Sequence, residues 1–338
     1  MSCLLLFAAT VRSPRPLAVA LLACALVAAG CGGGGDDSSS NAPPQATPDQ
    51  FPKAQGKTLA QLRADLPKAG PVLAPTGSYF VSGTSRLGFG LFTTSRAQIT
   101  NATAAVYIAP VGGGKAEGPF VAKYESLEVR PQFESQTTSQ DPQAAKTLYV
   151  AKVPFTKPGR YQVLGMARLG DRLVAATQAG PPSIVVPKAN DPVPGVGATP
   201  PRIHTPTETD VAGDLSKIDT RVPHDKDMHQ LDFADELGKK PIVLVFATPL
   251  LCQSRVCGPV VDVAEQVKSE VGDSVDFIHM EIYNDNQVAK GFRPQVGAFH
   301  LPTEPWLFVI DRHGKIATRI EGAFSADELQ AAVKKVQG

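Results

Sequence analysis

The sequence has little of several features that would identify a function at once. Among its 338 residues there are only 5 cysteines and 1 tryptophan, and Lys and Arg total 33 against 32 for Asp and Glu. Because the positive and negative charges are nearly equal in number, the chain has no strong net charge that would attract nucleic acid. No glycine-rich loop follows a predicted strand, so nucleotide binding is not expected. Hydrophobic residues make up 43% of the chain, which excludes wholesale disorder and indicates folded domains.

Only one apolar run is suited to a membrane, and it lies near the N-terminus. Arg12 and Arg15 precede the run Leu17 to Ala29, which is short for a membrane span and typical of a secretory signal. The run leads into Ala28-Ala29-Gly30-Cys31, which resembles the lipobox of bacterial lipoproteins. The resemblance implies that residues 1–30 are removed and that Cys31 is lipidated, which would hold the chain on the extracytoplasmic face of the cell membrane. An ordinary cleaved signal that contains a cysteine is the alternative.

Composition divides the exported part into regions. Residues 31–70 are of low complexity and are expected to form a flexible tether. Residues 71–187 contain short runs of β-branched and aromatic residues between turn residues, which predict an antiparallel β-sandwich of immunoglobulin type. Within it, the polar insert Gln132 to Lys146 is expected to be a mobile loop. Residues 188–225 are rich in proline and are expected to be an extended linker. The predicted strands are Ser78–Ser82, Gly88–Thr93, Ala104–Ala109, Phe120–Tyr124, Leu148–Phe155, Arg160–Leu169, Arg172–Thr177 and Ser183–Val186.

Residues 226–338 show a different pattern, in which strands alternate with helices. Their order predicts an α/β layer arrangement. Ser325 and Glu328 form a capping box that places the start of the last helix. The predicted elements are a helical turn Asp232–Leu237, strands Pro241–Ala247 and Val275–Tyr283, a helix Pro259–Val271, a hairpin of Trp306–Asp311 and Ile316–Ile320, and a helix Ala326–Val336.

Cys252 and Cys257 are the cysteines that remain once the signal is removed and Cys31 is lipidated. Outside the cytosol two such cysteines can form a disulfide. They lie at a predicted strand-to-helix turn, where the partial positive charge of a helix N-terminus favours a thiolate and lowers the pKa of a cysteine. Arg255, between them, is expected to act in the same direction.

From Lys226 to Gly338 the sequence resembles the thioredoxin family, on its buried strand, its two cysteines before a helix and the segment Leu301-Pro302-Thr303-Glu304-Pro305-Trp306. The resemblance implies a cis-proline that faces the cysteines and helps to hold a substrate chain. Pro305, preceded by Glu304, matches that position, and Pro302 is the competing candidate.

The segment departs from the family pattern at three positions. Four residues separate Cys252 from Cys257, where the family has two. Leu251 replaces the usual Trp, and Val245 replaces the buried acid of the preceding strand, which removes an expected proton acceptor. A second alignment, in which Cys257-Gly258-Pro259 matches the start of the family motif, makes Cys257 the nucleophile.

The favoured hypothesis is thiol-disulfide exchange with protein thiols or disulfides outside the cytoplasm, with Cys252 as nucleophile, Cys257 as resolving cysteine and no cofactor. One alternative is a non-catalytic binding lipoprotein with a structural disulfide. Another is a copper-delivery protein that uses both cysteines and His300, because thiolates and imidazole suit copper. The remaining histidines show no ligand spacing in the sequence; they are His204, His224, His229, His279 and His313.

Overall fold

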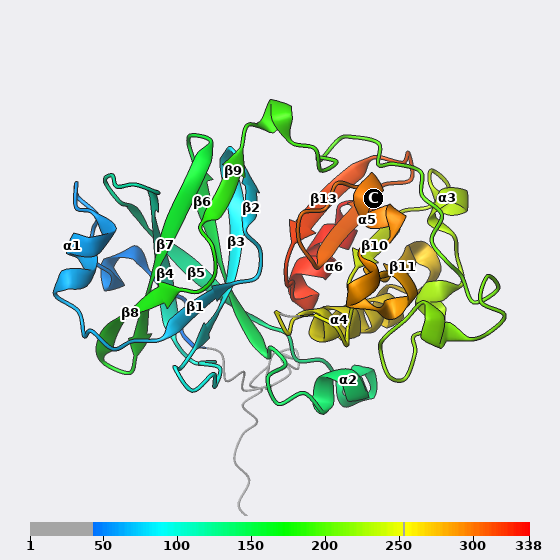
Figure 1. Ribbon diagram of the computed structural model, residues 1–338, viewed down its shortest axis with the longest axis horizontal. Helices are drawn as coiled ribbons and strands as arrows, with labels where there is room; N and C mark the ends of the chain where they lie inside the picture. The colour runs from blue at the N-terminus through cyan, green and yellow to red at the C-terminus, as the bar shows by residue number, and fades with distance from the viewer. Residues whose placement is uncertain (1–42, 253) are drawn as a thin grey trace, which may run out of the picture. The chain divides into compact units, whose positions relative to one another are not determined.

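The computed structural model describes residues 43–252 and 254–338 (Figure 1). The expected signal sequence, the lipidation site Cys31 and residues 31–42 of the expected tether lie outside the described residues. The rest of the expected tether, residues 43–70, is not a free spacer: it contains α1 (Leu59–Ala64), and its apolar side chains Phe51 and Leu62 are buried against the barrel strands, so the prediction of a flexible segment was wrong there. Among the residues that are described, no helix is long and apolar enough to cross a membrane.

The N-terminal region is a β-barrel rather than the expected sandwich. Its strands hydrogen-bond in the order β2-β9-β7-β4-β5-β6-β3-β1-β8, and β8 also pairs with β7, so that seven strands close into a ring. The immunoglobulin-type prediction was therefore wrong in how the strands are joined: β8 bridges β7 and β1, and no open edge separates two sheets. The strands are β1 (Val72–Pro75), β2 (Tyr79–Val81), β3 (Gly83–Phe92), β4 (Thr103–Pro110), β5 (Glu117–Ser126), β6 (Thr147–Phe155), β7 (Gly159–Leu169), β8 (Arg172–Gln178) and β9 (Ser183–Val186).

All eight predicted strands of this region are present, and one strand was missed. The missed strand β1 has four residues and ends in Pro75, so it carries little β signal. It nevertheless closes the barrel, pairing antiparallel with β3 and parallel with β8. Inside the ring, Phe89 and Tyr149 stack with their centroids 5.7 Å apart in a core of buried aliphatic and aromatic side chains.

The C-terminal region is the predicted α/β arrangement. Its sheet has the order β11-β10-β12-β13, with β10 and β11 parallel and the other neighbours antiparallel. Every residue of β10, β11 and β12 is buried, as expected for strands covered on both faces. The strands are β10 (Ile242–Phe246), β11 (Asp276–Met280), β12 (Trp306–Ile310) and β13 (Ile316–Glu321), and the main helices are α3 (Phe233–Glu236), α4 (Cys257–Val271), α5 (Pro294–Ala298) and α6 (Ala326–Lys334).

The polar insert expected to be a mobile loop is held against α4. It contains a short helix, α2 (Gln136–Ser139). The buried carboxylate of Asp262 accepts hydrogen bonds from the backbone N–H and the hydroxyl of Ser135, both at 3.1 Å. The same carboxylate accepts a hydrogen bond from the Nε of Arg221 at 2.9 Å. One buried acid therefore connects the insert, α4 and the segment before α3.

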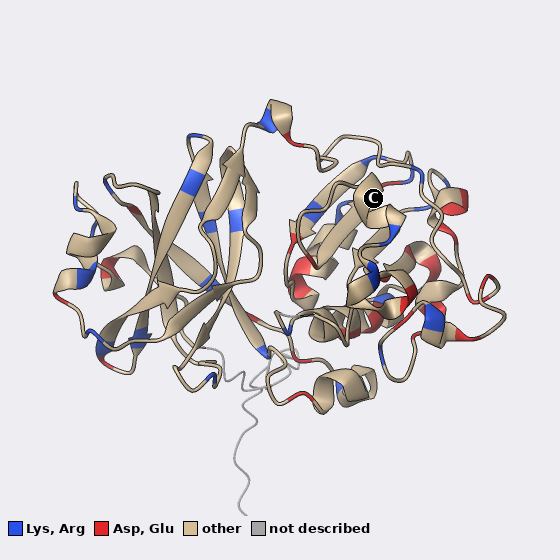
Figure 2. Cartoon of the chain, in the orientation of Figure 1, with Lys and Arg blue, Asp and Glu red and all other residues tan. Residues whose placement is uncertain are grey.

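Charged side chains also join the barrel to the α/β region. Residues 43–187 carry 15 Lys and Arg against 8 Asp and Glu, whereas residues 188–338 carry 16 against 22, and Figure 2 shows how these groups are distributed over the chain. The even total charge thus conceals a basic barrel and an acidic α/β region. Arg86 of β3 binds both carboxylate oxygens of Glu328, at 2.6 and 2.7 Å, and Glu328 also completes the predicted capping box of α6 with Ser325.

Several side chains of the proline-rich segment are buried in the α/β region. Val193 and Ile203 belong to the same apolar core as β10 and β12. Asp191 forms an ion pair with Arg319 of β13. These contacts hold a segment that has no strands of its own, and the turn Asp227–His229 that follows it lies beside β11.

Candidate functional site

The two cysteines lie at the connection between β10 and α4. β10 ends at Phe246, a loop follows, and Cys257 is the first residue of the helix. Cys252 is 4% exposed and Cys257 is fully buried, and both are free thiols. The loop between them contains Gln253, which lies outside the described residues. The structure therefore brings the predicted pair together at a helix N-terminus.

The surroundings of Cys252 stabilise a thiolate. A hydrogen bond from the Cys257 thiol is the largest cause, and the Ser254 hydroxyl and the backbone N–H groups of Val256 and Cys257 add to it against the opposing effect of burial. Together they lower the pKa of Cys252 to about 6. The Ser254 Oγ lies 3.2 Å from the Cys252 sulfur. At neutral pH Cys252 is therefore mostly a thiolate, and it is the nucleophile of the pair.

Cys257 has the opposite character. Burial, followed by its hydrogen bond to Cys252 and the charge there, raises its pKa well above the ordinary value. A charged sulfur at this position is disfavoured while Cys252 is a thiolate. This asymmetry agrees with the order predicted from the sequence, in which Cys252 attacks and Cys257 resolves, and it disfavours the alternative alignment.

Arg255 does not act as expected. Its guanidinium turns to Asp141 of the insert, with an Nη1 to Oδ2 distance of 3.2 Å, and it is not among the main causes that lower the pKa of Cys252. Its backbone adopts φ +60°, a left-handed conformation that costs a non-glycine residue about 1 kcal/mol. The backbone conformation at Arg255 thus directs this cation to Asp141 and away from the thiols.

The Glu304–Pro305 peptide bond is cis, at the position that the thioredoxin resemblance implied, and the peptide bond before Pro302 is not. Glu304 and Pro305 directly precede β12. The Glu304 carboxyl has a buried oxygen, Oε2, without a hydrogen-bond partner among the described residues. Burial, then the charges of Cys252 and Glu281, raise the pKa of this carboxyl to about 8.

Glu304 supplies the acid that was thought to be lost. Val245, which occupies the family's acid position, is an apolar residue fully buried in β10. Because Glu304 interacts with the charges of both cysteines, an ionisable carboxyl still lies beside the pair, reached from β12 rather than from β10. The sequence analysis assigned Glu304 only to substrate contact. No local motif signals an acid that enters the site from another strand.

Apolar side chains near the cysteines are exposed. Leu250, two residues before Cys252, is 61% exposed, and Phe292 is 56% exposed. Phe292 stacks on Tyr283 with ring centroids 5.4 Å apart, and the Tyr283 hydroxyl interacts with Glu304. An apolar surface of this kind suits contact with another polypeptide.

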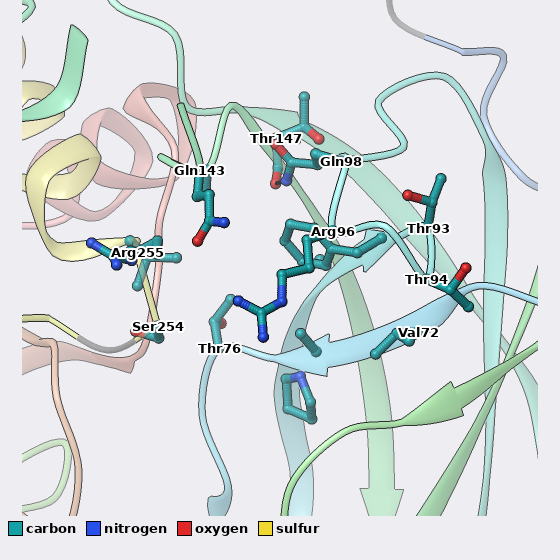
Figure 3. Close-up of a pocket in the computed structure, with 16 residues that line it drawn as sticks. Val72, Thr76, Thr93, Thr94, Arg96, Gln98, Gln143, Thr147, Ser254 and Arg255 are labelled. Carbon is teal, nitrogen blue, oxygen red and sulfur yellow. Dashed lines mark hydrogen bonds between the residues drawn. The ribbon is translucent and has the colours of Figure 1, made fainter. Parts of the chain in front are cut away.

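A pocket of about 510 Å³ opens beside the loop between the cysteines. Figure 3 shows Ser254 and Arg255 from that loop on one side and Thr76 and Arg96 of the barrel region on the other. Gln98, Gln143 and Thr147 add polar groups to its wall. The volume is in the range of ligand pockets, and the lining is both polar and apolar.

The copper alternative expected His300 near the cysteines. His300 follows α5 and is exposed, and no group of three metal-ligating side chains among the described residues contains it or either cysteine. A different group is present: Asp219, His229 and His279 meet in the interior, although their histidines show no ligand spacing in the sequence.

Comparisons with known proteins give few matches. No family model matches the chain, and no curated protein does. Among solved structures, the chain is similar to a putative thiol:disulfide interchange protein DsbE from Chlorobium tepidum, with a TM-score of 0.32, 16% identity, and coverage of 43% of this chain and 99% of that one. A thioredoxin-family thiol:disulfide interchange protein from Chlorobium tepidum TLS gives a TM-score of 0.25, 19% identity, and coverage of 32% and 86%. Because both scores are below 0.5, function is inferred below from the side chains of this chain.

Proposed function

We propose that this chain carries out thiol-disulfide exchange on other proteins outside the cytoplasm, held to the membrane by a lipid on Cys31. The observation that supports the exchange is the asymmetric thiol pair at the N-terminus of α4. One sulfur is held as a thiolate by four hydrogen-bond donors, and the other is buried as a thiol in contact with it. A disulfide that only joins two ends of a loop has no need of such a difference.

The exchange proceeds in two steps that conserve electrons. The Cys252 thiolate attacks one sulfur of a partner disulfide, a new bond joins it to that sulfur, and the partner's other sulfur leaves as a thiolate. Cys257 then loses its proton and attacks the Cys252 sulfur. This releases the second partner sulfur and leaves the Cys252–Cys257 disulfide. The partner has gained two electrons, and the reverse sequence would oxidise a partner dithiol.

In this proposal Glu304 is the general base that accepts the proton of Cys257. A carboxyl with a pKa of about 8 is near the operating pH, where it both accepts and donates protons efficiently. While Cys252 is a thiolate, its charge helps to keep Glu304 protonated. When Cys252 becomes part of a mixed disulfide that charge is removed, so the pKa of Glu304 falls and more of the carboxyl is ionised and able to accept a proton at the moment when Cys257 must be deprotonated.

The partner is expected to be a polypeptide. Exposed Leu250 and Phe292 provide an apolar surface near the thiolate, and the pocket beside Ser254 and Arg255 offers space for residues that flank the partner's cysteine. Glu304 and Pro305 lie where the thioredoxin resemblance implies contact with a substrate chain. The barrel has no catalytic group of its own in this proposal and serves as the support of this surface.

Trapping of mixed disulfides tests the proposal. Cys257→Ser leaves Cys252 able to attack but removes the resolving thiol, so covalent complexes with partner proteins should accumulate and be released by a reductant. Cys252→Ser is the matched control and should trap none. The reduction potential of the wild-type pair is the second measurement. A value between about −120 and −270 mV fits exchange, and a value below about −300 mV together with an absence of trapped complexes would identify a structural disulfide instead.

A further inference from the structure

Three buried side chains from separate segments converge near residues 247–252, the chain that leads from β10 to Cys252 and is called the redox loop below. Asp219 follows a 3-10 turn, His229 ends the turn Asp227–His229, and His279 lies in β11. Each is at most 1% exposed, and their ligand atoms all lie within 4.8 Å of one another. The Asp219 Oδ1 is 3.7 Å from the His279 Nδ1, and its Oδ2 is 3.8 Å from the His229 Nε2. These distances are too long for direct hydrogen bonds.

The hydrogen bonds around these rings leave nitrogen atoms unpaired. His279 Nε2 lies 3.0 Å from the carbonyl oxygen of Ala247, and because a carbonyl only accepts, Nε2 carries the proton. Its Nδ1 then faces Asp219 with no partner among the described residues, and neither ring nitrogen of His229 has one there. The Pro206 carbonyl approaches His229 without reaching hydrogen-bond geometry. Buried unpaired groups are costly, and an ion between them is one of the few explanations.

We propose that Asp219, His229 and His279 bind a divalent transition metal, Zn²⁺ by the type of its ligands, with His224 as the fourth ligand. Zinc bonds of about 2.0–2.2 Å to nitrogen and oxygen place tetrahedral ligand atoms about 3.4 Å apart, close to the separations observed here. The Nδ1 of His224 lies 3.9 Å from Asp219 Oδ2 and is itself buried without a partner. Imidazole and carboxylate are donors that suit Zn²⁺.

The groups behind the ligands are arranged as around a metal. Asp219 Oδ1 accepts the backbone N–H of Arg221 at 2.8 Å, and Oδ2 accepts that of Asp225 at 2.7 Å. The bond from His279 to Ala247 fixes the tautomer that leaves Nδ1 free to coordinate. Such outer contacts orient metal ligands in proteins. The carboxylate is thus held in place by the loop that also supplies His224 and His229.

A metal here would brace the redox loop without taking part in exchange. Ala247, which holds His279, follows β10 directly. Thr220, next to Asp219, donates its backbone N–H to Glu281 at 2.9 Å and accepts the N–H of Leu250 at 3.1 Å. The site therefore links β11, residues 219–229 and the chain leading to Cys252. Four protein ligands leave no open position, which is typical of a structural site.

Metal content and spectroscopy of the full chain test this site. Purified protein, detergent-solubilised where lipidated, is expected to hold one Zn²⁺ per chain by mass spectrometry of the metal. After removal of zinc, Co²⁺ should give the visible bands of a tetrahedral site without the ultraviolet sulfur-to-cobalt band that thiolate ligands produce. The variant C252S/C257S should give the same spectrum and stoichiometry, which separates this site from the redox pair.

Histidine variants complete the test. His229→Gln should weaken Zn²⁺ binding by at least about 100-fold in competition with a chelator, because loss of outer contacts alone costs up to that factor. His313→Gln, an exposed histidine, should bind Zn²⁺ as the wild type does. If wild-type protein takes up neither Zn²⁺ nor Co²⁺, or if the cysteine variant loses the metal, the proposal is overturned. The spectrum of the wild type and of C252S/C257S decides the matter even where His229→Gln does not fold.

Discussion

The hydroxyl of Ser254 lies 3.2 Å from the sulfur of Cys252, two positions before it in the chain. Ser254 is exposed, so it can be changed without disturbing the core. Its hydrogen bond is one of the causes that lower the pKa of Cys252 to about 6.

Ser254→Ala should therefore raise the pKa of Cys252 by about 1, since a hydrogen bond to a charged group is worth about 1.5–3 kcal/mol and one pKa unit about 1.4 kcal/mol. The pH dependence of iodoacetamide alkylation of the reduced protein measures this pKa. Ser269→Ala, on the exposed side of α4, serves as the control and should leave it unchanged. An unaltered pKa in Ser254→Ala would assign the thiolate entirely to Cys257 and the helix N-terminus.

Glu304→Gln should slow the resolving step. General acid-base catalysis by one side chain is worth on the order of 100-fold at its lower end, and release of a mixed disulfide from Cys252 should fall by about that factor. In the wild type the rate should show an ionisation that the variant lacks, at a pH below 8, because the Cys252 charge that helps to raise the Glu304 pKa to about 8 is absent from the mixed disulfide. Stopped-flow release of an aromatic thiol from the mixed disulfide follows this step. Glu128→Gln, which removes an exposed carboxyl, is the control and should keep the wild-type pH profile. If the ionisation persists in Glu304→Gln, it belongs to another group and the role given to Glu304 is wrong.

The part of this site that the sequence predicted is the part encoded locally. Two cysteines before a helix, and Ser325 with Glu328 before another, are patterns within one turn of chain, and both occur as expected. The acid beside the thiols was not predicted, because Glu304 lies 47 residues beyond Cys257 and reaches it only through the pairing of β12 with β10. His229 and His279 are 50 residues apart for the same reason. Spacing rules find ligands on one element and miss those that a fold assembles.

The barrel illustrates the same limit. The alternation of turns and β-branched runs predicted eight of the nine strands of this region, but not β1 and not which strands would pair across the ring. Closure depends on β1 lying parallel to β8 through two residue pairs, Val72 with Thr177 and Leu73 with Gln178. A contact between residues more than 100 positions apart has no local signature, so a closed barrel and an open sandwich of the same strands look alike in sequence.

The thiolate should make the reduced protein more stable at alkaline pH. The folded pKa of Cys252 is about 6 and the ordinary value is 9.0, so between these values the folded state has lost a proton that the unfolded state still holds. Stability from this group is complete above pH 9 and is lost as the pH falls through 6. The shift corresponds to about 4 kcal/mol at most.

This contribution is measured as a difference between two variants. Glu304, whose pKa is raised from 4.5 to about 8, lowers stability as the pH rises across that interval, so it is best removed from the comparison. The free energy of urea unfolding of reduced E304Q minus that of C252S/E304Q should increase from pH 6 to pH 9. A flat difference would show that Cys252 does not ionise early in the folded protein.

The last prediction concerns the insert that was expected to be mobile. Asp262 is buried and holds both Ser135 and Arg221, so Asp262→Ala leaves a buried guanidinium without one of its carboxylate partners and frees the N-terminal end of α2. Removal of one partner from a buried ion pair costs about 3–5 kcal/mol, and urea unfolding should show a loss of that size. Hydrogen exchange of residues 136–139 should accelerate more than that of β10, because this carboxylate holds Ser135, the residue that caps α2. Asp273→Ala, on an exposed turn, should change stability by less than about 0.5 kcal/mol. If the insert exchanges as slowly in Asp262→Ala as in the wild type, its other contacts, such as that of Asp141 with Arg255, are sufficient to hold it.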